Sequence, residues 1–444
     1  MNSQKNSEPL IEFHFELPKL SKNERQVLDL LAKAGRLIVP LYKLQEDEKY
    51  PGANFYPHDA TKEEIEKAAT KNPQILSPYT IVERVEGKLV AVPYHQKYAE
   101  YLKPISDKLL EAAKLCQNRE FKKGLVIQAE ALMSGTYEAA FSYWMQAKPY
   151  ILDISIGPND YFDDHLFSVK MSYQAWVGVV DKDQTKKLIG YKDLILSTRR
   201  KAVMSSEIIE GNKDAVGCKV IDAVLFSGLI ARTTFVGVNH PIDQNIKRKT
   251  GSEVILFKQA NTLRVKEQIL PTFKRIFSEG FRQGFDEEDL RRGEYSYVAL
   301  HELAHSYLNY KNATNLRNLL PVIEELAATA LGMRVGGSLL LRDLITTKRL
   351  KSMLIAYLCR SIYLEENKGT NKSLHNHTVG GAIFINYMLE SGALKQSKGL
   401  AIPNFTKMFI SLHDLSVILE KLLSFGTKKD AEKFVAKYKN VPNL

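Results

Sequence analysis

The most telling stretch of the sequence is YVALHELAHSYL, residues 297–308, which contains His301, Glu302 and His305 in an HExxH pattern. It contains neither Gly nor Pro, and its composition predicts a helix. Residues four apart share one face of a helix, so both imidazoles can bind one metal ion. Glu302 lies one residue along and can act on water at the metal without being a ligand. The stretch therefore predicts a catalytic metal site.

A catalytic zinc site needs a third protein ligand. The stretch PVIEELAATA, residues 321–330, predicts a second helix, because Pro321 suits a first helical turn. Its two acids, Glu324 and Glu325, are costly in an apolar helix unless they have partners. One carboxylate could bind the metal while the other holds the free N–H of a histidine. Alternatively, both acids are solvated and complement the helix dipole.

A third candidate lies in LHNHTVGG, residues 374–381, where His375 and His377 precede a glycine pair. This pattern alone is compatible with a metal ligand, a substrate contact or a turn.

Composition and charge narrow the function classes. The chain has 444 residues, of which 44% are hydrophobic and 25% charged, as in an ordinary soluble protein. The net charge is +11, but the basic residues are dispersed among 51 acids and form no nucleic-acid-binding motif, so nucleic acid is not an expected partner. Three distant cysteines, a polar N-terminus and no apolar run of about 20 residues predict a cytoplasmic protein without a membrane span.

The distribution of periodic segments predicts an α+β fold. Runs rich in β-branched or aromatic residues predict a series of strands at residues 150–156, 173–180, 220–226, 233–238 and 254–256. Residues 79–94 predict a hairpin that turns at Glu86 and Gly87, and residues 95–148 are mostly helical in pattern. From residue 260 onward helical patterns dominate. The front of the chain therefore contains the strands, and the rear is mainly helical.

Several separate motifs, in the same order, resemble those of the dipeptidyl-peptidase III family of zinc metallopeptidases. They are GANFYP (52–57), TKEE (61–64), VPYH (92–95), IGPNDYFDD (156–164), NHP (239–241), HELAH (301–305), the Glu324–Glu325 pair and His377. The similarity is greater to the shorter bacterial branch of the family, whose members are described as zinc-dependent hydrolases.

The resemblance implies roles for individual residues. The zinc ligands, for a single ion, would be His301, His305 and Glu325, with Glu302 as general base and Glu324 holding a ligand in place. Tyr161 and His377 would face the scissile carbonyl as catalytic residues, and Asn239 would contact the substrate backbone. The partner would be a peptide substrate.

The resemblance also implies the domain organisation. The fold would have two lobes around a cleft, one with a β-barrel-like sheet plus helices and the other mainly helical, carrying the HExxH zinc site. The strand-containing lobe would comprise residues 1–181 and about 221–262. The helical lobe would comprise about 182–220 and 263–420, followed by a C-terminal helical segment at about 421–444.

Some substrate-binding positions depart from the family pattern. Two acids that hold the free amino group of a substrate are replaced by Asn159 and Gln174, which removes the charge that would anchor an ammonium group. Gly381 and Asn386 stand where the family has arginines, and Thr329 stands where it has an acid. Dipeptidyl specificity therefore does not follow. The sequence predicts a zinc metallopeptidase that hydrolyses peptide or related amide bonds, and the alternative is a zinc-containing peptide-binding protein that has lost turnover.

Overall fold

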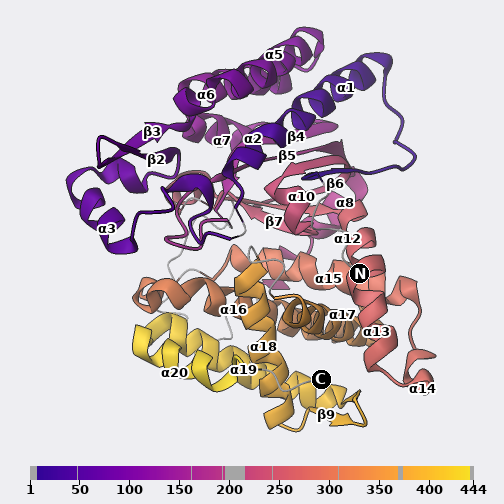
Figure 1. Cartoon of the computed structure of the whole chain (residues 1–444). Coiled ribbons are helices and arrows are strands. Elements are labelled where there is room, and N and C mark those ends of the chain that lie inside the picture. The colour runs from indigo at the N-terminus through magenta and orange to yellow at the C-terminus, as the bar shows by residue number, and fades with distance from the viewer. Residues whose placement is uncertain are drawn as a thin grey trace. The chain divides into compact units, whose positions relative to one another are not determined.

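The computed structural model describes residues 8–47, 49–161, 163–192, 194–195, 216–242, 244–308, 310–368 and 374–440. The chain divides into two compact units (Figure 1). Unit 1 contains Met1–Asp181, Ile221–Phe235 and His240–Thr250, and unit 2 contains Lys182–Val220, Val236–Asn239 and Gly251–Leu444. Residues 193 and 196–215, which the sequence analysis assigns to the helical lobe, lie outside the described residues, as do residues 441–444.

An antiparallel sheet forms the centre of unit 1. It contains β4 (Leu152–Asp160), β5 (Ser172–Val180), most of β6 (Val216–Gly228) and the short strand β1 (Leu10–Glu12). β5 pairs with β4 on one side and with β6 on the other, and β1 pairs with β6. Every residue of β4 and β5 is buried, so both faces of these strands are covered.

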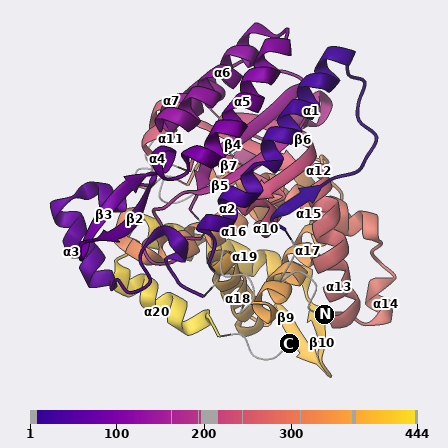
Figure 2. The same cartoon turned by 45° about the horizontal axis from the view of Figure 1, so that its top comes forward.

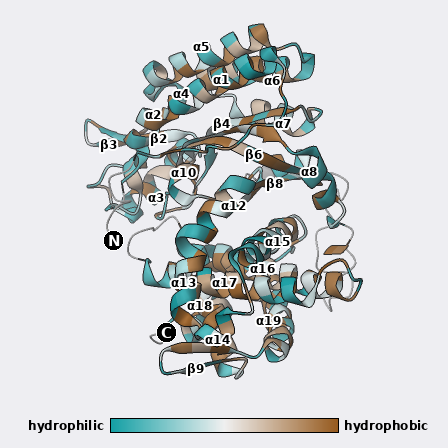
Figure 3. Cartoon of the chain, turned by 90° about the vertical axis from the view of Figure 1, so that its right-hand side faces the viewer, coloured by the Kyte–Doolittle hydropathy of each residue, from teal (hydrophilic) through white to brown (hydrophobic). Residues whose placement is uncertain are grey.

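Helices lie across this sheet (Figures 1 and 2). They are α1 (Lys22–Arg36), α2 (Ile38–Gln45), α5 (Ala99–Leu115), α6 (Arg119–Ser134) and α7 (Tyr137–Gln146). α1 packs against α5, β4 and β5, and α5 packs against α6. A capping box between Ser21 and Glu24 fixes the start of α1. α1 and α5 each carry hydrophobic and hydrophilic residues along their length, as expected of helices that cover a core (Figure 3).

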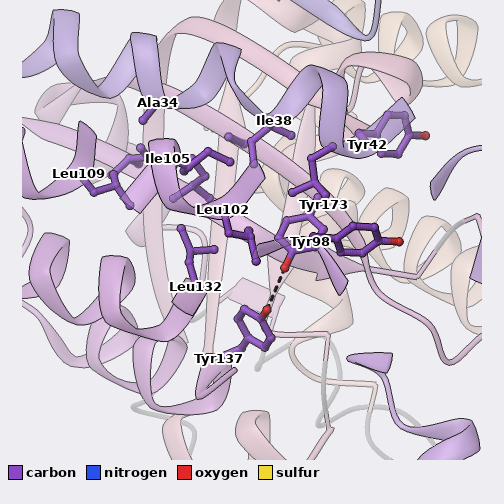
Figure 4. Close-up of a cluster of buried hydrophobic side chains, with 14 of the residues drawn as sticks. Ala34, Ile38, Tyr42, Tyr98, Leu102, Ile105, Leu109, Leu132, Tyr137 and Tyr173 are labelled. Carbon is purple, nitrogen blue, oxygen red and sulfur yellow. Dashed lines mark hydrogen bonds between the residues drawn. The ribbon is translucent and has the colours of Figure 1, made fainter. Parts of the chain in front are cut away.

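The core between these helices and the sheet combines aliphatic and tyrosine side chains (Figure 4). Leu102, Ile105 and Leu109 recur along one face of α5 and are fully buried. The hydroxyl groups of Tyr137 and Tyr173 lie 2.8 Å apart and form a hydrogen bond, which satisfies two polar atoms inside the core.

Smaller elements complete unit 1. They are η1 (Ala53–Phe55), α3 (Lys62–Lys71), η2 (Pro73–Leu76), β2 (Thr80–Val85), β3 (Lys88–Pro93), α4 (Tyr94–Lys97), α10 (Leu229–Thr233) and α11 (Gln244–Thr250). β2 and β3 form the predicted hairpin. Its turn residues Glu86 and Gly87 have φ values of 49° and 76°, the left-handed conformation that a two-residue hairpin turn requires.

Unit 2 is mainly helical. Its helices are α8 (Lys182–Ile189), α12 (Lys258–Arg264), η5 (Val265–Ile269), α13 (Leu270–Ile276), α14 (Glu279–Arg282), α15 (Glu287–His305), η6 (Ala313–Leu319), α16 (Leu320–Leu340), α17 (Thr347–Glu366), α18 (His375–Glu390), α19 (Phe405–Phe425) and α20 (Lys428–Tyr438). α15 packs against α16 and α17, and α18 packs against both of these. The strands are β7 (Gly237–His240), β8 (Ser252–Phe257) and the hairpin of β9 (Leu394–Ser397) and β10 (Leu400–Pro403).

The predicted α+β class, with one sheet-containing and one helical part, is confirmed, but the sheet is not a closed barrel. Its strands follow the open path β4-β5-β6-β8-β7, with β1 beside β6. The first residues of β6 belong to unit 2, where Lys219 lies 3.8 Å from Glu253 of β8. Within the described residues, β4 and β7 are the two ends of this path, and closure would require these two strands to pair.

One predicted strand is wrong. Residues 233–238 do not form a continuous strand, because Thr233 ends α10 and β7 begins only at Gly237. Thr234 separates the two elements with a φ of 50°. A short β-branched run carries too little periodicity to distinguish a strand from a helix end followed by a strand.

In the described part of the chain, none of the helices has both the length and the apolar character that crossing a bilayer requires.

His240 makes the stability of unit 1 depend on pH. Its ring is fully buried against Phe141 and Trp176, and neither ring nitrogen has a hydrogen-bond partner in the described structure. Burial, assisted by the positive charge of Lys247, lowers the pKa of His240 to about 3. The unfolded chain therefore binds a proton between about pH 6.5 and pH 3 that the folded chain does not, so stability falls as the pH falls through this range.

We expect the free energy of unfolding to fall by about 2 kcal/mol between pH 6.5 and pH 5 from this residue alone. His240→Phe should remove this part of the pH dependence, whereas the exposed His413→Gln should leave it unchanged. Urea unfolding at the two pH values measures the difference. An unchanged slope in His240→Phe would show that the imidazole is protonated, and therefore solvated, in the folded protein.

Candidate metal centre

Helix α15 presents the two histidines of the HExxH pattern. The helix starts at a capping box between Asp286 and Asp289, and acids in its first turn complement the positive end of the helix dipole. His301 is buried, and His305 is the last residue of the helix. The predicted helix therefore exists, and it places both imidazoles on one face.

Helix α16 brings the acids to this face. Pro321 lies in its first turn, as the sequence predicts, and Glu324 and Glu325 follow. The two helices approach closely at Gly332, where a Cβ atom would lie 3.0 Å from the backbone nitrogen of His301. Any side chain at Gly332 would push α16 away from α15, so this glycine is part of what positions the carboxylates.

Three ligand groups converge between α15 and α16. The Nε2 atoms of His301 and His305 lie 3.1 Å apart, and Glu325 Oε2 lies 3.2 Å from the first and 3.5 Å from the second. One ligand atom from each of these residues falls within 4.8 Å of the other two. Glu324 Oε1 lies on the other side of the second imidazole, 3.7 Å from His305 Nδ1. The sequence left open which of the two neighbouring acids lies at the possible metal site. In the structure Glu325 lies at the two Nε2 atoms, and Glu324 lies at the far nitrogen of His305.

The electrostatics of the cluster suit a bound cation. Burial alone would lower the pKa of His305, but Glu325 and Glu324 raise it to about 10. Burial alone would raise the pKa of Glu325, yet His377 and His305 hold it well below the usual range of a carboxyl group. The carboxylates therefore attract positive charge to the point where the imidazoles meet. Two imidazoles and one carboxylate, with space for a fourth ligand, are a donor set that fits catalytic zinc.

Thr329 fixes the orientation of His301. Its hydroxyl donates to the backbone carbonyl of Glu325 (3.1 Å), one turn earlier in α16, so its oxygen accepts from His301 Nδ1–H at 3.1 Å. The Tyr297 hydroxyl lies 3.3 Å from the same oxygen. This arrangement places the proton on Nδ1 and leaves the lone pair of Nε2 directed at the ligand cluster.

We therefore expect Thr329→Val, which has nearly the same shape but no hydroxyl, to weaken metal affinity by about 10–100-fold. Thr329→Ser keeps the hydroxyl and should stay close to wild type. Competition with a chromogenic zinc chelator measures both variants on protein of known folded fraction. Equal affinity in the valine variant and wild type would mean that packing, and not this hydrogen bond, orients the ring.

Glu302 is half-buried, and its side chain lies against Gly237 of β7, where a Cβ atom would come within 2.7 Å of Glu302 Cγ. Burial raises its pKa, while the imidazoles of His301 and His305 act in the opposite direction. Its backbone carbonyl accepts a hydrogen bond from Asn239 Nδ2 at 2.9 Å. Asn239 Nδ2 also donates to Ser306 Oγ at 2.7 Å, so Asn239 holds the end of α15. Its Oδ1 is buried and makes no hydrogen bond in the described part of the chain.

His377 joins the cluster from α18. Its Nδ1 lies 3.2 Å from Glu325 Oε2. Burial lowers the pKa of His377 to about 4, although Glu325 acts in the opposite direction, so the imidazole is neutral at pH 7. The pattern LHNHTVGG contains the start of a helix and not a turn, because α18 begins at His375. Gly381 lets α18 approach α17, because a Cβ atom there would lie 2.8 Å from Ser361.

The other predicted site residues belong to unit 1. Asn159 is buried on β4, and its Nδ2 donates to Ser155 Oγ at 2.9 Å. Gln174 is fully buried on β5, and neither of its side-chain polar atoms has a hydrogen-bond partner in the described residues. Tyr161 directly follows β4. The functions of these three residues stay predictions.

Three residues beside the cluster have no signal in the sequence that marks them as part of a site. Tyr297, Tyr357 and Arg360 line a pocket together with Glu325 and His377. Tyr357 and Arg360 lie in α17, whose sequence contains no recognisable motif. They reach the site only through the packing of α17 on α15 and α18.

No model of a known protein family matches the chain. Among curated proteins, Nudix hydrolase 3 from Arabidopsis thaliana is 24% identical over 430 residues, which cover 88% of this chain and 54% of the plant protein. The chain thus spans about half the length of the curated relative that it matches.

Two solved structures are similar over nearly the whole chain. DPP III from Caldithrix abyssi has a TM-score of 0.81 and 21% sequence identity, and covers 95% of this chain and 91% of its own. Dipeptidyl-peptidase III from Corallococcus sp. strain EGB has a TM-score of 0.83 and 21% identity, and covers 97% and 91%. The resemblance seen in the sequence is confirmed at the level of the fold: this chain has the fold of the dipeptidyl-peptidase III structures.

Proposed function

We propose that the chain is a zinc-dependent hydrolase that cleaves peptide or related amide bonds. The observation that carries this proposal is the convergence of His301, His305 and Glu325 beside a half-buried Glu302. The similarity to two dipeptidyl-peptidase III structures supports a peptide as the substrate. His301, His305 and Glu325 would hold one zinc ion, with Glu324 against the far nitrogen of His305.

The proposed reaction needs a metal ion, a general base and hydrogen-bond donors to the oxyanion. When bound, the ion would polarise the scissile carbonyl and make water more acidic. Glu302, whose pKa is raised by burial, would take a proton from water and deliver it to the leaving amine. The neutral His377 has one ring N–H, which would leave Glu325 Oε2 when that carboxylate holds the ion and would donate instead to the developing oxyanion, a contribution of roughly 2.7–4 kcal/mol for one donor. Tyr161 would be a second donor, as the family resemblance implies.

The side-chain amides of Asn159 and Gln174 affect whether a substrate needs a free amino terminus. A buried amide carries no net charge, so neither residue would attract a substrate ammonium group as a carboxylate does. We propose that a free amino terminus is not required for cleavage. Peptides with free and with acetylated amino termini, in matched pairs, should therefore be cleaved at similar rates by the zinc-loaded protein. Mass spectrometry of the products identifies the bonds, and cleavage of the free peptides alone would contradict this specificity.

A second candidate function is zinc-dependent peptide binding without turnover. It is favoured by the same loss of charged positions at Asn159 and Gln174. Under this alternative, calorimetry would detect peptide affinity in a protein with one zinc ion per chain, and no product would form from either set of peptides.

A further inference from the structure

Arg360, on α17, is a buried cation without an anionic partner among the described residues. Only 6% of its surface is exposed, and its guanidinium donates a hydrogen bond to the side-chain carbonyl of Gln268. No described carboxylate lies within ion-pair distance of it. Buried arginines are rare unless they are paired, because desolvation of an uncompensated charge is costly.

The neighbouring charges do not compensate Arg360. Glu294, the carboxylate whose charge acts on Arg360, is engaged by Arg264, with Nη1 and Oε1 3.0 Å apart and both side chains buried. Burial, together with the positive charge of Arg264, lowers the pKa of Arg360 to about 9, although Glu294 acts in the opposite direction. The carboxylate that acts on Arg360 is therefore already engaged by Arg264, and Arg360 itself has no ion-pair partner among the described residues.

A small pocket lies beside Arg360. Arg360, Tyr357 and Ser361 of α17 line it, together with Tyr297 and His377. The Ser361 hydroxyl is buried and makes no hydrogen bond of ordinary geometry in the described structure, although it lies near enough to the Tyr357 hydroxyl to act on its pKa. Glu325 also lines the pocket, but its Oε2 lies 3.2 Å from both His301 and His377, so its charge is engaged by the imidazoles. The accessible space is about 20 Å³, close to what one water molecule requires.

We propose that this pocket binds one small monovalent anion, which pairs with the guanidinium of Arg360 and accepts a hydrogen bond from Ser361. A free halide ion and a single carboxylate group of a peptide share this chemistry. A tetrahedral divalent anion is too large for the space. The anion site itself does not depend on hydrolysis, whereas its occupation by a substrate carboxylate rests on the proposed function.

Thermal unfolding in chloride, with methanesulfonate, a bulkier anion that carries no carboxylate, replacing chloride at constant ionic strength, tests the site. Chloride should raise the unfolding temperature of wild type in a saturable manner, because it binds only the folded protein. Arg360→Met should weaken the apparent chloride affinity by about 10–100-fold, the loss expected for a charged hydrogen-bond partner. Arg334→Met is the matched control, because Arg334 is already paired with Glu420 and Ser416. It should keep the chloride response.

Arg360→Lys keeps the charge and should retain part of the response, so the test remains decisive if the methionine variant does not fold. Competition then distinguishes the two sources of the anion. The experiment uses Glu302→Gln protein, with and without zinc, and an acidic peptide against its uncharged amide. If the acidic peptide competes with chloride and its uncharged amide does not, the natural ligand is a substrate carboxylate. If chloride binds and neither peptide competes with it, the ligand is a free anion.

The proposal is overturned if wild type shows no saturable response to chloride or to the acidic peptide. It is equally overturned if Arg360→Met and Arg360→Lys respond as wild type does. A chloride response in a protein that hydrolyses no peptide would contradict the proposed function and leave the anion site standing.

Discussion

Replacement of Glu325 by Gln should abolish stoichiometric zinc binding. The carboxylate oxygen Oε2 lies within 3.5 Å of the Nε2 atoms of both His301 and His305, and no other carboxylate in the described residues lies that close to both. A neutral amide is a poor ligand for zinc, so the site would keep only two ligands. We expect the loss in affinity to exceed the roughly 10–100-fold that substitution of residues supporting a ligand produces.

Glu324→Gln is the matched control, because it makes the same chemical change one residue earlier. Its carboxylate lies 3.7 Å from His305 Nδ1, on the side of the ring away from the cluster. It should reduce zinc affinity by about 10–100-fold and leave the stoichiometry at saturating zinc unchanged. Zinc content measured by mass spectrometry after dialysis compares both variants with wild type. Full zinc in Glu325→Gln, or a greater loss in Glu324→Gln, would reverse the assignment of the two acids.

Replacement of Glu302 by Gln should separate metal binding from catalysis. Glutamine has the same shape but cannot take a proton from water, and the residue is placed beside the ligands and not among them. We expect zinc content to stay at the wild-type level and kcat to fall by about 10²–10⁴-fold, the usual contribution of a general base. Initial rates on a peptide that wild type cleaves, measured on protein of known zinc content, provide the comparison.

Two outcomes would contradict this role for Glu302. Loss of zinc together with loss of activity would mean that the carboxylate supports the metal itself. Unchanged activity would mean that another group removes the proton from water.

The local part of the site could be predicted from the sequence because it depends on helical geometry alone. The separation of His301 and His305 by four residues places them on one face wherever the helix packs. The choice between Glu324 and Glu325 was different, because it depends on the rotation of α16 against α15. That rotation is set by close packing at Gly332, a contact between residues about 30 positions apart.

Other features depend on packing that leaves no local signal. Arg360 lies in a helix whose sequence contains no motif. That it lacks an anionic partner can be recognised only from the structure, in which Glu294 is paired with Arg264. The orientation of His301 by Thr329 likewise joins two helices. The sheet shows the same limit. Its long strands were predictable from their composition, whereas its open edges depend on which distant strands pair.

The most direct test of a zinc centre that drives hydrolysis is a titration of metal-free protein with zinc while peptide cleavage is followed. Activity should rise in proportion to added zinc and stop rising at one equivalent per chain. The same titration of Glu325→Gln should give no activity over this range. Cleavage that persists in excess chelator, or no cleavage by wild type with one zinc ion bound per chain, would contradict the account.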